Sequence, residues 1–330
     1  MLRNRYVIWG IFITILLSSC KKDPKPFQYV KTIGYGFTTT VQMMIWQNEI
    51  YFYDYYTSKT AFGKLNASSG EKTILCYLDT KETDYAFDGA HLYYITNDSL
   101  ISYTIQNGDT AFISRLGYST SSITGTNPHV IFADASYVYY VRYHLVSGFI
   151  TYTLCKWDPL TKAETTITDV VNSAMILHDN QSIFYMKVNP YPYATYSIVK
   201  IDKSSNAQTS VSNSTQAIVN LIGIDNNTLY YTETSDSMIM HSVLPAADAV
   251  CSDHGRTSLM INNNFFENGW YYYMSSETIS RGCMVSKFNI SSLEKINFAS
   301  SLHGIQRIVL TDDHYLYVLD QSGAIGLLNL

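Results

Sequence analysis

The chain has 330 residues, of which 46% are hydrophobic and 15% are charged. This composition excludes a disordered chain, and the length suits one large β domain or two domains of ordinary size. The net charge is −5, and it becomes −7 without the N-terminal segment that carries Arg3 and Arg5, because 20 Lys and Arg then remain beside 27 Asp and Glu. A nucleic-acid-binding surface needs a basic stripe to contact phosphates, so this acidic balance argues against a nucleic-acid partner.

The N-terminus carries the features of a secretion leader. Arg3 and Arg5 precede an apolar run of 12 residues, 6–17, which is too short to span a bilayer. The run ends in Leu17-Ser18-Ser19-Cys20, which resembles the lipobox of bacterial lipoproteins. A plain secretory leader with a chance cysteine is the alternative interpretation.

The lipobox resemblance implies that residues 1–19 are a signal peptide and that Cys20 is the lipidated N-terminus of the mature protein. Several acyl chains would then hold the protein firmly to a membrane. Residues 20–26 are expected to form a short polar tether. Lys21-Lys22-Asp23 resembles the signal that sends some Gram-negative lipoproteins to the outer face. We therefore expect an outer-membrane lipoprotein on the periplasmic or cell-surface face.

A repeated triplet of one apolar and two aromatic residues dominates residues 27–330. The first aromatic residues are spaced by 42, 46, 45, 46, 41 and 46 residues, and the last copy has Val in place of the second aromatic. A period of about 44 residues rich in Tyr is typical of a four-stranded propeller blade. The seven copies are Ile50-Tyr51-Phe52, Leu92-Tyr93-Tyr94, Val138-Tyr139-Tyr140, Ile183-Phe184-Tyr185, Leu229-Tyr230-Tyr231, Trp270-Tyr271-Tyr272 and Leu316-Tyr317-Val318.

Two further elements recur in register with the triplet. An aspartate lies five residues before the first aromatic in five copies, at Asp88, Asp134, Asp179, Asp225 and Asp312. Its carboxylate can accept backbone N–H groups, so a tight hairpin is expected there. Downstream, a Lys-apolar-Asn/Asp motif ends a third strand before a Ser- or Thr-containing turn, as in Lys156-Trp157-Asp158. The expected order in each blade is inner strand, Asp turn, aromatic strand, Lys strand and outer strand.

The repeat predicts a single all-β domain over residues 27–330, a seven-bladed β-propeller of four-stranded blades. The seventh copy lacks an outer strand, and residues 27–33 at the other end of the domain are expected to supply it. Such closure removes the open edge at which sheets would associate. A six- or eight-bladed propeller is the alternative.

The Asp turn, the aromatic pair and the Lys motif resemble those of the YWTD-related and TolB-like extracellular propellers. The resemblance covers the whole mature chain, although the YWTD tetrapeptide itself is absent. These families include binding modules, scaffolds and a few enzymes. The resemblance therefore implies a fold and an extracellular setting but no particular ligand.

The sequence contains no HExxH, CxxC, GxSxG or P-loop motif, and no cofactor or metal is expected. Cys76 and Cys155 fall within strand patterns, where a buried thiol is the expected state. Cys251 and Cys283 lie in neighbouring repeats, and the sequence leaves open whether they pair.

Candidate ligand residues follow from the repeat register. Positions ten residues before the first aromatic lie early on the inner strand, where they would surround the mouth of a central channel. Thr83, His129, Ala174, Asn220 and Arg307 occupy these positions. In the first and sixth repeats the turn is shorter, so Met43 and Asn263 are the equivalent residues, and five of the seven positions are polar. They are interpreted either as a site for an anionic or hydroxylated ligand or as the solvated end of a channel.

Longer hairpins between the second and third strands are further candidates for ligand binding. Tyr143 in the segment 142–145, and Tyr191 and Tyr193 beside two prolines, are expected to open on the same face. Tyrosine offers a rigid apolar face with a polar tip, so these rings suit a sugar or a partner side chain. The pattern leaves open whether these rings bind a ligand or only decorate the surface. The segment Asp253–Arg256 is expected to be a solvated loop, with anion binding by its charged side chains as the alternative.

These features favour a non-enzymatic binding or scaffold lipoprotein whose partner is an envelope protein or a glycan. The alternative is a propeller-type carbohydrate hydrolase or lyase, with His129 as acid/base and Arg307 as the charge stabiliser. Glycoside hydrolysis usually needs a close pair of carboxylates, and the expected ring contains none. A purely structural envelope component is the third possibility.

Overall fold

The computed structural model describes most of the propeller region. The described residues are 29–39, 41–56, 58–78, 85–117, 131–146, 149–170, 176–189, 195–214, 218–225, 228–233, 239–243, 252–256, 265–267, 269–275, 284–289, 292, 294–298, 305–312 and 314–329. Every regular element in these ranges is a β-strand. None of the described residues belongs to a helix of the length and apolarity that a membrane crossing requires.

The strands pair into four-stranded antiparallel sheets, of which the described residues form seven. Six sheets take four strands in direct succession. Their strands are β2 (Gln42–Trp46), β3 (Glu49–Tyr56), β4 (Lys59–Leu65) and β5 (Lys72–Leu78); β6 (Tyr85–Phe87), β7 (His91–Thr96), β8 (Ser99–Thr104) and β9 (Thr110–Arg115); β10 (Ile131–Ala133), β11 (Val138–Val146), β12 (Phe149–Trp157) and β13 (Glu164–Val170); β14 (Ile176–His178), β15 (Ser182–Asn189), β16 (Thr195–Asp202) and β17 (Gln208–Ser214); β18 (Ile218–Asp225), β19 (Thr228–Glu233), β20 (Ile239–Val243) and β21 (Ser252–Arg256); and β22 (Phe265–Glu267), β23 (Trp270–Ser275), β24 (Met284–Asn289) and β25 (Lys295–Phe298).

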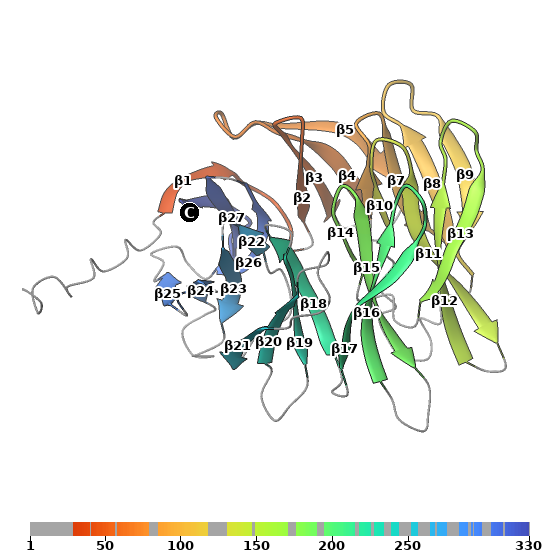
Figure 1. Cartoon of the computed structure of the whole chain (residues 1–330). Coiled ribbons are helices and arrows are strands. Elements are labelled where there is room, and N and C mark those ends of the chain that lie inside the picture. Colours follow the sequence, from red (N-terminus) through yellow and green to blue (C-terminus); the bar gives the residue numbers. More distant parts are fainter. Residues whose placement is uncertain are drawn as a thin grey trace, which may run out of the picture.

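The remaining sheet joins the two ends of the domain. It consists of β26 (Ile305–Thr311), β27 (Tyr315–Asp320), β28 (Ile325–Asn329) and the N-terminal strand β1 (Tyr29–Gly34). β1 runs antiparallel to β28, with Tyr29 opposite Leu328 and Gly34 opposite Ile325. Figure 1 shows β1 in red beside the blue C-terminal strands. The prediction that the N-terminal segment supplies the missing outer strand is confirmed.

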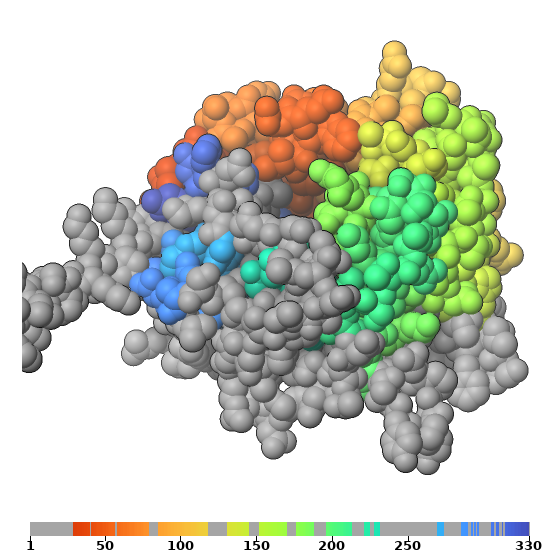
Figure 2. Space-filling view, in the orientation of Figure 1, coloured from red at the N-terminus to blue at the C-terminus, as the bar shows by residue number. Residues whose placement is uncertain are grey.

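The first strands of neighbouring sheets lie against one another. β2 contacts β26, β26 contacts β22, β22 contacts β18, β18 contacts β14, and β10 contacts β6. The sheets therefore stand around a common axis with their first strands innermost, and the molecule is an all-β propeller of four-stranded blades (Figure 1). In Figure 2 the surface passes from orange through yellow to green as successive blades follow one another in space.

The aromatic pair of each triplet fills the spaces on both sides of a blade. Side chains alternate along a strand, so neighbours in the pair point to opposite faces. Tyr140 packs with Tyr93 of the preceding blade, whereas Tyr139 packs with Tyr185 of the following blade, and all four residues are at most 1% exposed. A blade that is buried on both faces needs consecutive apolar residues, which explains the triplet.

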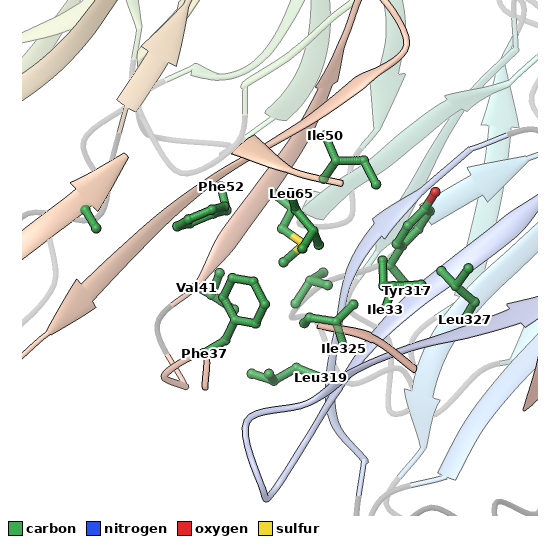
Figure 3. Packing of buried hydrophobic residues seen from close by; sticks show 13 residues of the cluster. Ile33, Phe37, Val41, Ile50, Phe52, Leu65, Tyr317, Leu319, Ile325 and Leu327 are labelled. Carbon is green, nitrogen blue, oxygen red and sulfur yellow. The ribbon is translucent and has the colours of Figure 1, made fainter. Parts of the chain in front are cut away.

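The closing contact between the first and last blades has its own core. Ile33 and Phe37 from the N-terminal segment pack with Phe52 and Leu65 of the first blade and with Leu319 of the last (Figure 3). The turn between β27 and β28 reinforces this junction, since the Phe37 N–H donates to the Gly323 carbonyl at 3.0 Å. A Cβ at residue 323 would lie 2.4 Å from the Phe37 oxygen, so only glycine fits there.

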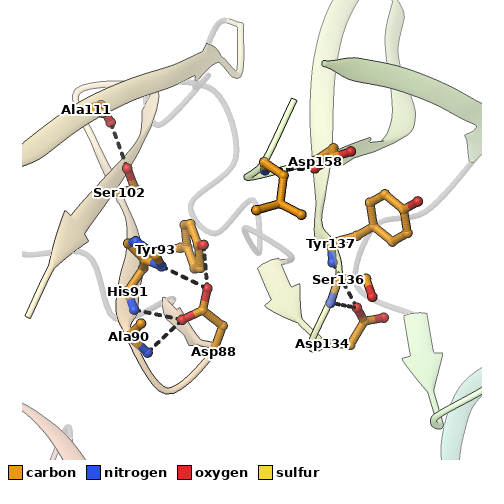
Figure 4. A network of polar contacts seen from close by, with 11 residues as sticks. Asp88, Ala90, His91, Tyr93, Ser102, Ala111, Asp134, Ser136, Tyr137 and Asp158 are labelled. Carbon is orange, nitrogen blue, oxygen red and sulfur yellow. Dashed lines mark hydrogen bonds and ion pairs between the residues drawn. The ribbon is translucent and has the colours of Figure 1, made fainter. Parts of the chain in front are cut away.

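The repeated aspartate forms the expected hairpin between the first and second strands. In four blades its Oδ1 accepts the N–H groups of the second and third residues after it, over 2.7 to 2.9 Å; these are Asp88, Asp134, Asp179 and Asp312. Its own N–H donates to the carbonyl of the third residue. Figure 4 shows the turns at Asp88 and Asp134. The prediction of a carboxylate turn is confirmed at these four positions.

A second turn follows the Lys-apolar-Asn/Asp motif. At Asp158 and Asp202 the Oδ1 atom accepts two backbone N–H groups, and the residue four positions later donates its N–H to the turn's first carbonyl. Gly70 occupies that fourth position after Asn66 and has a φ of 75°, a conformation that glycine adopts without strain. A hydrogen bond from the Ser204 hydroxyl, followed by bonds from Ser205, lowers the pKa of Asp202 to about 2.

Two segments differ from their expected structure. Residues 142–145 are not a hairpin but part of the nine-residue strand β11. Asp253–Arg256 is not a loop but lies in β21, which pairs with β20 as the outermost strand of its sheet. In both cases backbone pairing continues the ladder across polar residues and satisfies their N–H and C=O groups.

Candidate functional site

Two of the predicted channel residues lie on inner strands, as expected. Asn220 belongs to β18 and Arg307 belongs to β26. Each follows a register shift in the pairing with the second strand, between Ile218 and Asn220 in one blade and between Ile305 and Arg307 in the other. Bulges of this kind redirect side chains and are frequent near binding sites. The other predicted ligand residues, Thr83, His129, Asn263, Tyr191 and Tyr193, and the lipidation residue Cys20, lie outside the described residues.

Tyr143 occupies a different setting from the one expected. It lies in β11, it is 3% exposed, and its ring meets that of Tyr152 edge-on at 5.2 Å between centroids. Its N–H donates to the Leu116 carbonyl of the preceding blade at 2.6 Å. The prediction that Tyr143 lies in an exposed hairpin is therefore wrong. In the sequence, Ser and Gly directly after Val146 are residue types favoured in turns, and they were the available signal for the end of this strand.

A charged network joins the second and third blades near their outer strands. One oxygen of Glu164, on β13, accepts hydrogen bonds from the Ser114 hydroxyl at 2.9 Å, from the Tyr140 hydroxyl and from the Arg142 guanidinium. Arg142 also donates to the Ser114 oxygen at 2.7 Å. We call these four residues the Glu164 network. It connects strands from two blades through one carboxylate oxygen.

The network shifts the titration of its members. Burial opposes the charge of Glu164, but the bonds from Tyr140, Arg142 and Ser114 outweigh it and lower the pKa of the carboxyl. Burial likewise opposes the charge of Arg142, but the bond to Glu164 raises the pKa of the guanidinium. Both groups are therefore ionised at neutral pH. The Arg142 Nε atom is buried and has no hydrogen-bond partner within the described part of the chain.

A groove of about 500 Å³ opens beside the network. We call it the Arg115 groove. Phe112, one of its lining residues, is 64% exposed although it is a large apolar residue. Sequence reasoning missed this groove, because its two walls come from different blades. Its lining includes Phe112, Ser114, Arg115, Arg142, Tyr143 and His144.

A second hollow of about 880 Å³ lies between the first and last blades, on the face of the Asp turns. Glu49 and Lys64 form an ion pair across 2.5 Å at its wall, and both side chains are more than a third exposed. Asp312 lies opposite, with one oxygen accepting from the Tyr317 hydroxyl at 2.5 Å. Exposed pairs of this kind contribute little to stability, and the polar groups here are engaged with one another.

A cationic stack lies between the third and fourth blades. Lys203 is 7% exposed, its Nζ atom is 3.3 Å from Asp134, and it lies over the rings of Phe132 and Tyr139 at 5.6 and 5.2 Å. The His178 ring stacks on Phe132 with 4.0 Å between centroids. Loss of hydration on the stacked face, together with the Lys203 charge, lowers the pKa of His178 to about 4. The histidine is therefore neutral at pH 7.

The described cysteines behave as predicted. Cys76 and Cys155 are buried free thiols, and burial raises the pKa of each to about 11. Cys251 and Cys283 lie outside the described residues. Among the residues that the structure does describe, no group of three or more His, Cys, Asp or Glu could hold a metal ion.

No protein-family model and no curated protein matches the sequence. Solved structures do match over nearly the whole chain. An oligogalacturonate lyase in complex with manganese is 10% identical, with a TM-score of 0.59 over 92% of this chain and 95% of that chain. An acylaminoacyl peptidase of Pyrococcus horikoshii is 9% identical, with a TM-score of 0.57 over 91% of this chain and 53% of that chain.

An uncharacterised protein of Listeria monocytogenes is also similar. It is 12% identical, with a TM-score of 0.53 over 91% of this chain and 94% of that chain. At such identities a shared fold does not imply a shared function. The comparisons therefore establish a propeller-like fold, in agreement with the repeat.

Proposed function

We propose that this protein is a membrane-anchored propeller of the cell envelope that binds or scaffolds an envelope protein or a glycan without catalysing a reaction. In this proposal Cys20 carries the lipid anchor at the outer membrane, and residues 20–26 tether a seven-bladed ring. The seven sheets and their adjoining inner strands support that blade number. A ring closed by β1 is a rigid platform, which suits recognition by loops and grooves on its surface.

The observation that best supports a binding role is how the carboxylates are used. Asp88, Asp134, Asp179 and Asp312 are engaged in turns, and Glu164 is engaged between blades. The buried Asp54 accepts the N–H and hydroxyl of Thr38 and so fixes the crossover from β1 to β2. A hydrolytic site needs carboxylates that are available to the substrate, whereas these carboxylates stabilise turns, the contact between two blades and the crossover from β1 to β2.

The lipid anchor is tested by growing cells with radiolabelled palmitate. We expect label on the wild-type chain and none on the Cys20→Ala chain, which should also leave the membrane fraction. Label that persists in Cys20→Ala would refute anchoring at this residue.

The scaffold role is tested by solubilising the anchored protein from its own membranes in mild detergent and identifying what co-purifies by mass spectrometry. A partner in fixed ratio is the expected result. Recovery of the protein alone would contradict a protein scaffold and leave a glycan as the ligand.

A carbohydrate-active hydrolase or lyase is the second candidate. The matched bulges before Asn220 and Arg307 favour a ligand at the inner strands, where His129 is also predicted. If turnover of an acidic oligosaccharide is found, His129→Ala should abolish it. Unchanged turnover would remove His129 from the mechanism.

A further inference from the structure

The Arg115 groove combines groups that suit one kind of small ligand. Phe112 and Arg115 come from the outermost strand of the second blade, whereas Arg142 and His144 come from β11 of the third. A volume of about 500 Å³ is large enough for a monosaccharide and its immediate substituents. The groove therefore offers guanidinium, imidazole and aromatic surfaces within the space of one small molecule.

The two arginines of the groove differ in their partners. Arg142 is neutralised by Glu164 through the network described above. Arg115 is exposed and has no ion-pair partner within the described ranges. The groove thus keeps about one net positive charge, held by a residue that can bind a carboxylate through two parallel hydrogen bonds.

The exposed ring of Phe112 provides the second contact. A side chain of this size with 64% exposure on an outer strand keeps an apolar surface in water. Such a ring gains free energy when a flat apolar surface of a ligand covers it. The C–H face of a pyranose is a surface of this kind, and its hydroxyl groups would meet the His144 side of the groove.

We propose that the Arg115 groove binds an acidic sugar of the hexuronate type, with its carboxylate on Arg115 and its apolar face on Phe112. A strongly acidic peptide is less suited, because the groove has only about one net positive charge to meet its several carboxylates. The inference deepens the proposed binding function and rests on it, since it names the ligand class of one surface of the module.

Titration of D-glucuronate into the purified full chain, followed by saturation-transfer NMR, tests this assignment. Binding should weaken as salt is raised, because the carboxylate contact is exposed. D-glucose and acetate should bind at least tenfold more weakly, since each lacks one of the two contacts. Equal binding of D-glucose and D-glucuronate would overturn the proposal. Binding of an acidic hexapeptide without D-glucuronate would also overturn it.

Three variants locate the site. Arg115→Gln and Phe112→Ala should each raise the Kd for D-glucuronate roughly tenfold, because each removes one main contact. Tyr77→Ala is the matched control, since Tyr77 is 61% exposed on β5, the outer strand of another blade, and it should leave the Kd unchanged. Unchanged binding in Arg115→Gln, or equal losses in Phe112→Ala and Tyr77→Ala, would overturn the assignment.

The outcome is separable from that of the scaffold proposal. If D-glucuronate fails to bind while a partner co-purifies in fixed ratio, the groove assignment is wrong and the scaffold role stands. If D-glucuronate binds at Arg115 and no protein co-purifies, the groove assignment stands and the protein-scaffold role is wrong.

Discussion

Removing the charge of Glu164 should loosen the contact between the second and third blades. In Glu164→Gln the neutral side chain replaces a carboxylate oxygen that accepts from Ser114, Tyr140 and Arg142. Hydrogen bonds to charged groups contribute about 1.5 to 3 kcal/mol each, and an uncompensated buried charge costs more. The side chains of Arg142 and Glu164 are 24% and 30% exposed, so hydration of the remaining groups offsets part of the lost stabilising free energy. We therefore expect a net destabilisation of about 2 kcal/mol.

The assay is urea unfolding of the full chain, followed by tyrosine fluorescence and circular dichroism. The matched control is Glu71→Gln, since Glu71 is exposed at the turn after β4 and its side chain makes no contact with the network. Glu71→Gln should stay within about 0.5 kcal/mol of wild type. If the two variants unfold at the same urea concentration, the network does not stabilise the blade contact and the reasoning is refuted.

The pH dependence gives an independent check. The pKa of Glu164 is lowered in the folded protein, so its contribution is present above the unfolded-state pKa and is lost as the pH falls through the folded-state value. The difference in stability between wild type and Glu164→Gln should therefore shrink as the pH is lowered from about 5 towards 3. A difference that stays constant over this range would contradict the ionic origin of the effect.

Three further predictions follow from the turns, the stack and the thiols. Asp88→Ala should cost about 1 kcal/mol and Asp88→Asn less, because asparagine keeps the oxygen that accepts the turn N–H groups; thermal unfolding measures the order of the two. Wild type should lose stability as the pH falls from about 6.5 to about 4, where unfolded histidine is protonated but His178 is not, and His178→Phe should flatten that slope in urea titrations. Cys76 and Cys155 should resist iodoacetamide at pH 8 in the native protein and react after unfolding, as peptide mass spectrometry would show, because their pKa is raised to about 11.

The propeller was predictable because its main signals are local. The pair Tyr139-Tyr140 fills two inter-blade spaces at once, so every blade needs it and the period becomes visible in the sequence. The Asp134 turn is formed by bonds that span only three residues. Closure of the ring by β1 was predicted because the seventh repeat is one strand short, and not from any contact between the termini.

The candidate site was less predictable because its walls meet only in three dimensions. Ser114 and Glu164 are 50 positions apart, and their approach depends on the angle between two blades, which no local pattern encodes. Arg142 and Tyr143 were assigned to a longer hairpin between the second and third strands of their blade. The strand continues through them, since Glu164 neutralises Arg142 and the core accepts Tyr143.

The pairing of β1 with β28 determines when the ring can close during synthesis. The strand that closes the ring leaves the ribosome nearly 300 residues before the strand that receives it. Until β28 has been made, the last blade has an open edge and β1 has no strand to pair with. Contacts this distant in sequence form slowly, so the unclosed ring is the state most exposed to aggregation. If the protein is exported before it folds, β1 and β28 stay unpaired until both strands have been exported.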